Sequence, residues 1–271
     1  MIRNRRDINF IKGIELNTFS FACSAAWVIA SGGKVNLYAD GFATDLLDFI
    51  PYDNIYKLTV PAHIPVCSWA CGKFFALEQM PLGDVHIDGD VYLKDSKLIE
   101  SVLDGTDYDC VVQSIEDDRE VLLKYYDSAR KVMMDYKIST AQCSLKYSPS
   151  YNCGTVGFFN QELKDKYLVE YFTTLNNIIH SSGCVKAFND DPMAVPDLIM
   201  EQQFLYELAK PYRVHNLLGN SDTMYQTAVD IHYQHVLGRF KEQQINQIKT
   251  ELAYVNPDLY KKAVKAVSYL Y

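Results

Sequence analysis

The sequence predicts an α/β fold in which a mixed, mostly parallel sheet of the Rossmann type is flanked by helices. Helical and extended patterns alternate along the first half of the chain, which is the order that parallel strands with helical crossovers produce. The 271 residues are 48% hydrophobic and 13% aromatic, enough to bury a large core. No repeat, Pro- or Ser-rich linker or charge block interrupts the chain. We therefore expect one domain over residues 1–241, with a C-terminal helical extension of the same domain over 242–271.

The first half of the chain contains the alternating helical and extended segments. An Ala-rich apolar segment predicts a buried helix, and "GGK" ends it before an apolar strand. The expected helices are 20–31, 41–50 and 67–80, and the expected strands are 35–40, 54–60 and 85–93. The segment "DINFI" (7–11) is a weak candidate for the first strand.

The second half is richer in amphipathic helices. Pro196-Asp197 begins one of them, and Pro257 suits the first position of the last one. The expected strands are 108–116, 151–160 and 212–218, and the expected helices are 119–136, 161–183, 197–210, 241–255 and a final one opened by residues 256–258.

Charge and cysteine usage narrow the class of protein. A formal charge of −8 and a pI near 5.2 argue against a nucleic-acid binder. The N-terminus lacks the apolar core of a signal peptide, and no apolar run approaches the roughly 18 residues of a membrane span. We expect a cytoplasmic protein with reduced core thiols. Cys67 and Cys71 could share a helix face, but no second Cys or His pair stands at zinc spacing nearby.

Two carboxylates stand out in "VHIDGDVYL" (85–93), which reads as a central strand. In one strand Asp88 and Asp90 would project from the same side, about 6 to 7 Å apart, and would suit Mg²⁺ or Mn²⁺. Gly89 would let a ligand approach the backbone. The alternative is a surface turn, because Asp-Gly is a common turn dipeptide. Asp40, at the end of "VNLYAD", is equally a nucleotide contact at a strand end or a turn residue.

Three segments together resemble a known enzyme class. "HIDGDVYL" resembles the aspartate motif of GT-A fold glycosyltransferases. "YNCGTVGFF" (151–159) resembles the N-x-G-x-x-x-F strand of retaining members, such as the glycogenin-like and lipopolysaccharide galactosyltransferases, and "HVLGRFK" (235–241) resembles their H-x-x-G-x-x-K signature. The resemblance covers roughly residues 20–241. The sequence looks still closer to uncharacterised bacterial GT-A-like proteins with a W-A-x-G-K helix, matched by Trp69, Ala70, Gly72 and Lys73.

The resemblance implies a metal-dependent transfer of a sugar from a nucleotide sugar, with UDP as the expected nucleotide, to a glycan or glycolipid acceptor, with retention of configuration. Mn²⁺ or Mg²⁺ would be held by Asp90 and His235, with Asp88 touching the metal or the donor ribose. The same resemblance leaves peripheral membrane contact open.

Other roles carry over in the same way. The diphosphate would meet Lys241 and the Gly238 backbone, although Glu242-Gln243 replaces the family's Pro-Trp. Asn152, Glu201 and Gln202 are implied to be catalytic residues near the sugar, and Gly154 and Lys73 are implied to bind the donor. A solvated helix face is the alternative for Glu201, and a snorkelling helix stripe is the alternative for Lys73.

Two other functions remain open on sequence alone. A GT-A-like module that binds a nucleotide or sugar without turnover would keep the same motifs. A nucleotidyltransferase or phosphatase-like enzyme using the Asp pair for Mg²⁺ ranks last, because no Gly- and Arg-rich phosphate loop lies near residue 10. His232, three residues before His235, would share a helix face with it and fits a supporting or surface position best.

Overall fold

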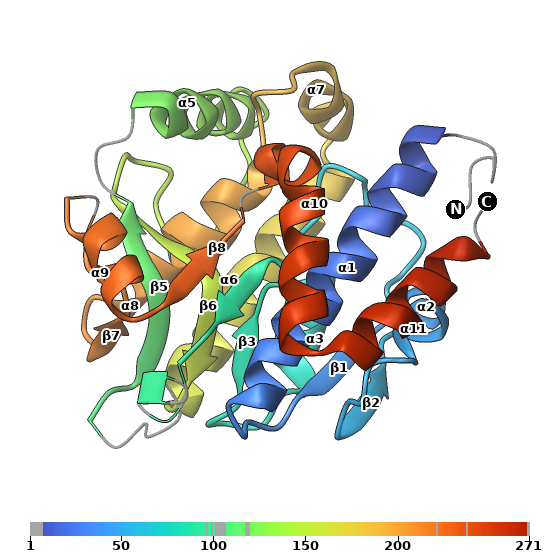
Figure 1. The fold of residues 1–271 in the computed structure, drawn as a ribbon. Coiled ribbons are helices and arrows are strands. Elements are labelled where there is room, and N and C mark those ends of the chain that lie inside the picture. Colours follow the sequence, from blue (N-terminus) through green and yellow to red (C-terminus); the bar gives the residue numbers. More distant parts are fainter. Residues whose placement is uncertain are drawn as a thin grey trace. The chain divides into compact units, whose positions relative to one another are not determined.

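The computed structural model describes residues 8–95, 97–98, 100, 107–116, 120–220, 222–236 and 238–269, with the backbone alone at 8–11, 120–122 and 238–242. The protein has a mixed α/β fold (Figure 1). The chain divides into two compact units that alternate along the sequence. Unit 1 comprises residues 1–58, 87–101 and 228–271, and unit 2 comprises residues 59–86 and 102–227.

Unit 1 contains, among its described residues, four helices and two small sheets. Strands β1 and β2 pair in parallel, whereas β4 and β8 pair antiparallel. Its elements are α1 (Ile8–Ala30), β1 (Asn36–Ala39), α2 (Gly41–Leu47), β2 (Asn54–Lys57), β4 (Val91–Leu93), β8 (Tyr233–His235), α10 (Gly238–Val255) and α11 (Pro257–Ser268); α9 (Met224–Asp230) crosses the division between the units.

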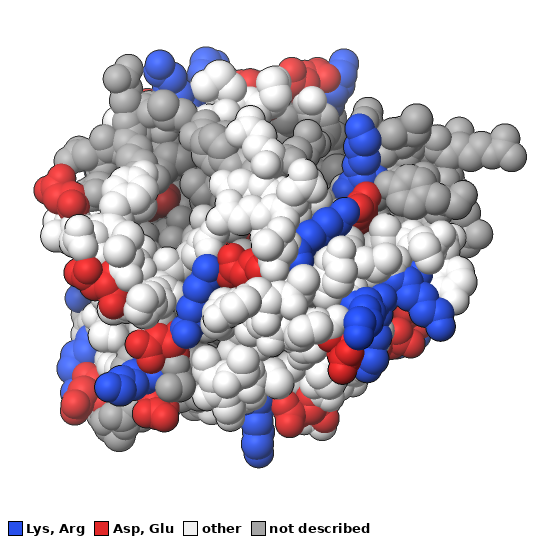
Figure 2. Space-filling model, in the orientation of Figure 1, with Lys and Arg blue, Asp and Glu red and all other residues white. Residues whose placement is uncertain are grey.

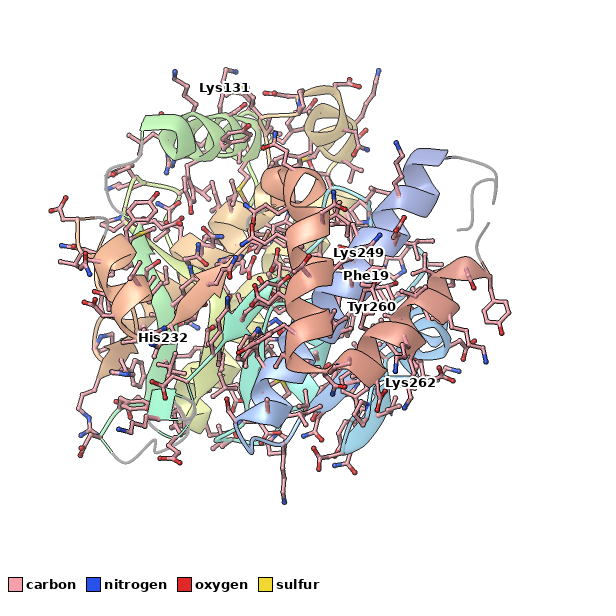
Figure 3. All side chains as sticks on the ribbon, viewed as in Figure 1. Phe19, Lys131, His232, Lys249, Tyr260 and Lys262 are labelled. Carbon is pink, nitrogen blue, oxygen red and sulfur yellow. The ribbon has the colours of Figure 1, made fainter. Side chains whose placement is uncertain are left out.

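The core of unit 1 lies where α1 meets α10 and α11, which Figure 1 shows packed together. Phe19 of α1 is buried there beneath Tyr260, with ring centroids 6.0 Å apart. The Lys249 ammonium lies 4.7 Å from the Phe19 ring, and Figure 3 shows these three side chains side by side. Burial of this apolar surface joins the two ends of the sequence in one core.

Helix α1 corrects three sequence expectations. The segment proposed as a first strand is helical from Ile8, and the helix predicted at 20–31 is the C-terminal half of a longer one. The stretch Lys12–Ala30 has a mean hydropathy of 1.2, so the expectation that no apolar run reaches the length of a membrane span was wrong. Of that stretch, 56% is buried within the protein. More than half of this apolar stretch is therefore used in packing within the protein.

The last helix forms as its sequence predicts. Pro257 occupies its first turn, and the Asn256 side chain accepts a hydrogen bond from Leu259 N at 3.0 Å. Residues four apart on α11, such as Leu259 and Ala263, are buried in the core of unit 1. The outer face of α11 carries exposed lysines, seen in blue beside red carboxylates in Figure 2.

Unit 2 contains a four-stranded sheet in the order β3-β6-β5-β7. Strands β5 and β7 are parallel, but β5 and β6 are antiparallel. Its elements are α3 (Cys71–Gln79), β3 (Val85–Ile87, at the division between the units), β5 (Cys110–Glu116), α5 (Glu120–Asp135), β6 (Ser150–Phe158), α6 (Gln161–His180), α7 (Cys184–Asp190), the π-helix η1 (Leu198–Gln203), α8 (Phe204–Ala209) and β7 (Val214–Asn216).

The expectation of a mostly parallel sheet is therefore corrected: the described sheets are small, and both parallel and antiparallel pairs occur among them. Alternating strands and helices give a parallel pair only when the helix carries the chain back to the end of the sheet where the preceding strand began. Here α5 and the segment 136–149 bring β6 back antiparallel to β5. The predicted helix at 197–210 also divides, into η1 and α8.

The segment 85–93 is likewise not one strand. It divides into β3, which belongs to the four-stranded sheet, and β4, which pairs with β8, with a turn at 88–90 between them. The seven cysteines are free thiols, as expected of core residues, and among them Cys67 is half-buried and the others are buried.

Candidate metal centre

The turn between β3 and β4 holds two of the predicted ligands. Asp88 O accepts a hydrogen bond from Val91 N at 2.9 Å, which closes the turn, and Asp90 O accepts one from Val236 N at 2.9 Å. In the antiparallel β4–β8 pair, Val91 lies opposite His235. Pairing with β8 therefore places His235 beside the turn, although it lies far away along the sequence.

Helix α1 fixes the same turn from the other side. Ser20 Oγ donates to Gly89 O at 2.8 Å and lies 3.2 Å from the Tyr92 hydroxyl, while Ser24 Oγ donates to Val91 O at 2.7 Å. These two serines and Tyr92 are buried. The four consecutive carbonyls from residue 88 to residue 91 are thus all hydrogen-bonded, so the turn has a defined backbone conformation.

Asp88, Asp90 and His235 come together at this turn, all within unit 1. Each offers one ligand atom, and these atoms lie within 4.8 Å of one another. His235 Nε2 is 3.5 Å from Asp90 Oδ1, and the two side chains are only 13% and 12% exposed. Two carboxylates this close repel unless a proton or cation lies between them, so the cluster has the donors and spacing that a divalent cation requires.

The imidazole supports the same interpretation. His235 Nδ1 is buried and, among the described residues, finds no hydrogen-bond partner. A buried ring nitrogen without a partner is costly, and metal coordination would satisfy whichever nitrogen turned toward the ion. One imidazole with two carboxylates suits Mn²⁺ better than Mg²⁺, which prefers oxygen ligands. The residues present fit a divalent cation.

The sequence argument predicted this grouping with the wrong local geometry. Asp88 and Asp90 do not alternate along one strand but flank Gly89 in a turn. The alternative of a surface turn also fails, because Asp90 is only 9% exposed. His232 does not share a helix with His235: it precedes β8 in a turn with a φ of 53° (Figure 3).

Three other residues predicted in the donor site lie in unit 1. Asp40 caps α2, where its carboxylate accepts from Ala43 N at 2.9 Å, and its side chain is exposed. This is the turn role that the sequence left open for Asp40. Gly238 begins α10, and Lys241 lies in its first turn. The side-chain surroundings of both positions fall outside the described residues.

The predicted residues of unit 2 form a separate polar cluster. Lys73 Nζ lies 2.5 Å from Glu201 Oε1 and donates to Cys153 O at 3.0 Å. The Lys73 and Glu201 side chains are only 6% and 2% exposed, which excludes both the snorkelling lysine and the solvated glutamate. An ion pair this deeply buried joins α3 to η1.

The two predicted amides meet partners that the sequence did not indicate. Asn152 accepts from Gly154 N at 3.0 Å and donates to Glu116 Oε1 at 2.9 Å. Gln202 accepts from the Tyr126 hydroxyl at 2.5 Å. Glu116 ends β5 and Tyr126 lies on α5, and neither position belongs to a recognisable motif.

Asp197, just before η1, is a further buried acid. Its carboxylate accepts from Ala70 N at 2.8 Å and from the Tyr171 hydroxyl at 3.1 Å. Burial, followed by the nearby Glu201, raises the pKa of Asp197 to about 7. The π-helix that follows places Glu201 and Gln202, and such segments are frequent at functional sites.

The fold and the turn at residues 88–90 define an α/β protein with a candidate divalent-cation centre made of two aspartates and a histidine. The chain belongs to a family of unknown function, DUF6734, whose profile matches residues 10–266. Among curated proteins and solved structures, none matches this chain significantly.

Proposed function

We propose that this protein is a metal-dependent glycosyltransferase of GT-A type that uses a nucleotide sugar, with UDP as the expected nucleotide. The observation that carries the proposal is the approach of Asp88, Asp90 and His235 to within 4.8 Å between ligand atoms. These three positions are the ones that the resemblance assigns to the metal. The resemblance predicts their grouping from the sequence, although His235 lies far from the two aspartates along the chain.

The chemistry of the ligands suits a diphosphate. A dication held there would act as a Lewis acid that stabilises negative charge on the leaving diphosphate. Asp90 and His235, both mostly buried, would hold the ion, and the half-buried Asp88 would stand at the more accessible side of the group. A glycan or glycolipid acceptor, a cytoplasmic location and retention of configuration belong to the same proposal.

One observation favours the alternative of a module that binds a nucleotide sugar without turnover. The resemblance places Glu201 near the sugar, yet its carboxylate is 2% exposed and forms an ion pair with Lys73. A carboxylate held in this way contributes to the structure of unit 2. If Glu201 is required for transfer in related enzymes, its burial here favours binding over catalysis.

The first test measures metal-dependent binding of UDP by thermal shift and titration. Binding to the native state should raise the melting temperature in UDP with Mn²⁺. Asp90→Ala and His235→Ala should abolish the shift and weaken Mn²⁺ binding at least tenfold, as expected for loss of a ligand. Asp40→Asn is the matched control, because it removes an exposed carboxylate of unit 1 and keeps the helix cap. An unchanged Mn²⁺ affinity in both site variants would rule out a metal centre at these residues.

A second measurement separates enzyme from binding module. Hydrolysis of UDP-sugars by the wild-type protein with Mn²⁺, lost in Asp90→Ala, would support the transferase. Metal-dependent binding of UDP without hydrolysis of any donor tested would support the binding module. Failure of UDP and of other nucleotides to bind in the presence of Mn²⁺ would contradict both.

A further inference from the structure

Phe21 has an unusual place on α1. From Thr18 to Val28, every side chain of this helix is buried or half-buried except Phe21, which is 38% exposed. Its neighbour Ser20 is fully buried and holds the Gly89 carbonyl. The outward position next to the metal turn is thus occupied by an aromatic ring.

The ring of Phe21 lies directly against Gly89. A methyl group added at Gly89 would meet three carbons of the Phe21 ring at 2.6 to 2.7 Å, closer than such atoms approach in proteins. The sequence suggested that Gly89 leaves room for a ligand, but the structure gives that room to Phe21. Since Gly89 separates Asp88 from Asp90, the ring lies within one residue of both predicted metal ligands.

A single exposed phenylalanine is common on protein surfaces, so exposure alone decides nothing. The position is more informative than the exposure. The ring packs against a turn whose backbone is held by Ser20 and Ser24. Phe21 stays 38% exposed there, next to a residue flanked by two members of the cluster suited to a dication. An aromatic surface at that place can stack on a planar ring, and stacking contributes substantially to binding of nucleobases.

We infer that Phe21 is the stacking surface for the nucleobase of a nucleoside diphosphate whose phosphates are held by a cation at Asp88, Asp90 and His235. This inference rests on the proposed function and adds to it a base-recognition residue outside all the motifs of the resemblance. A diphosphate on the ion places the attached nucleoside within reach of a ring that lies one residue away. Phe21 would then stack on the planar base, and the cation would bind the charged diphosphate.

The test compares two ligands in the presence of saturating Mn²⁺: UDP, which carries a base, and inorganic pyrophosphate, which does not. Phe21→Ala should lower the affinity for UDP about tenfold, the scale of one base–aromatic contact. The affinities for pyrophosphate and for Mn²⁺ alone should stay within about twofold, since the ligands of the ion are untouched. Phe21→Tyr should keep UDP binding, and Phe21→Leu, which preserves apolar packing without a ring, should lose it.

Two further variants sharpen the result. Gly89→Ala should displace the ring and weaken UDP binding in the same direction as Phe21→Ala. Phe42→Ala is the matched control, because Phe42 is a 46% exposed phenylalanine of unit 1 on another helix. Equal losses for UDP and pyrophosphate in Phe21→Ala, or a loss no greater than in Phe42→Ala, would overturn the inference alone. Absence of binding of either ligand to the wild-type protein would overturn the proposed function and, with it, the inference.

Discussion

The Ser20 hydroxyl of α1 donates a 2.8 Å hydrogen bond to the carbonyl of Gly89, the residue between the two predicted metal-binding aspartates. Ser20 is fully buried, so its hydroxyl depends on protein partners such as this carbonyl. Ser24, one helical turn later, holds Val91 O in the same way. The longest helix of unit 1 therefore contributes to the geometry of the candidate centre without supplying a ligand.

Ser20→Ala should weaken Mn²⁺ binding about tenfold, in the range of changes to groups that orient metal ligands. It should also lower the free energy of unfolding by roughly 0.5 to 1.5 kcal/mol, because the half-buried Gly89 would lose the donor to its carbonyl. Titration with Mn²⁺, followed by the Mn²⁺ spin-resonance signal, and urea denaturation measure the two effects.

Thr18 offers the matched control for Ser20. Its buried hydroxyl donates to Ile14 O at 2.8 Å, within the same helix, and has no part in the turn. Thr18→Val should leave Mn²⁺ affinity unchanged, because that carbonyl belongs to the regular helix. If Ser20→Ala and Thr18→Val alter Mn²⁺ binding equally, the helix has no specific positioning role.

The Lys73–Glu201 pair gives a prediction for unit 2. Lys73→Met should lower the free energy of unfolding by about 3 to 5 kcal/mol, since a carboxylate would be left in a buried site without its cation. Combining it with Glu201→Leu should recover part of that loss, because no buried charge then remains. Urea denaturation of the two single variants and the double variant measures the coupling.

The exposed pair Lys131–Asp135 serves as the control for this cycle (Figure 3 labels Lys131). Its side chains are 75% and 56% exposed, so Lys131→Ala should leave stability unchanged within error. A Lys73→Met variant as stable as Lys131→Ala would show that the buried pair contributes little.

Much of the secondary structure could be predicted from sequence because apolar periodicity and capping residues act locally. Asn256 and Pro257 fixed the start of α11, and the apolar pattern at 161–183 predicted α6. The strand 85–93 was predicted wrongly because its apolar flanks belong to two different sheets. Pairing partners are chosen by tertiary contacts, which a local pattern does not contain.

The candidate site shows the same limit. The resemblance to the GT-A motifs was sufficient to group Asp88, Asp90 and His235, whose ligand atoms lie within 4.8 Å of one another. The roles of Ser20 and Phe21 could not be predicted, because they depend on how α1 packs against the turn. Two serines four residues apart in an Ala-rich buried helix were the available signal, since buried hydroxyls need partners.

Asp197 predicts how stability depends on pH. Its pKa is raised from the ordinary 3.8 to about 7, first by burial and then by the nearby Glu201. Between these two values the folded protein holds a proton that the unfolded chain has released. The free energy of unfolding therefore falls as pH rises through this range, by about 1.4 kcal/mol for each unit that separates the two pKa values.

Asp197→Asn should remove this contribution, because the amide does not ionise in either state. Urea denaturation at about pH 5 and about pH 8 should show wild-type stability declining relative to the variant as pH rises. Asp197→Asn also weakens the hydrogen bonds from Ala70 N and the Tyr171 hydroxyl, which lowers stability at both pH values. This loss cancels when the change in unfolding free energy between the two pH values is compared for the wild-type protein and the variant. A variant that follows the wild-type pH dependence in parallel would show that Asp197 is already ionised in the folded protein at pH 5, with Lys73 and the two hydrogen bonds outweighing the cost of burying its charge.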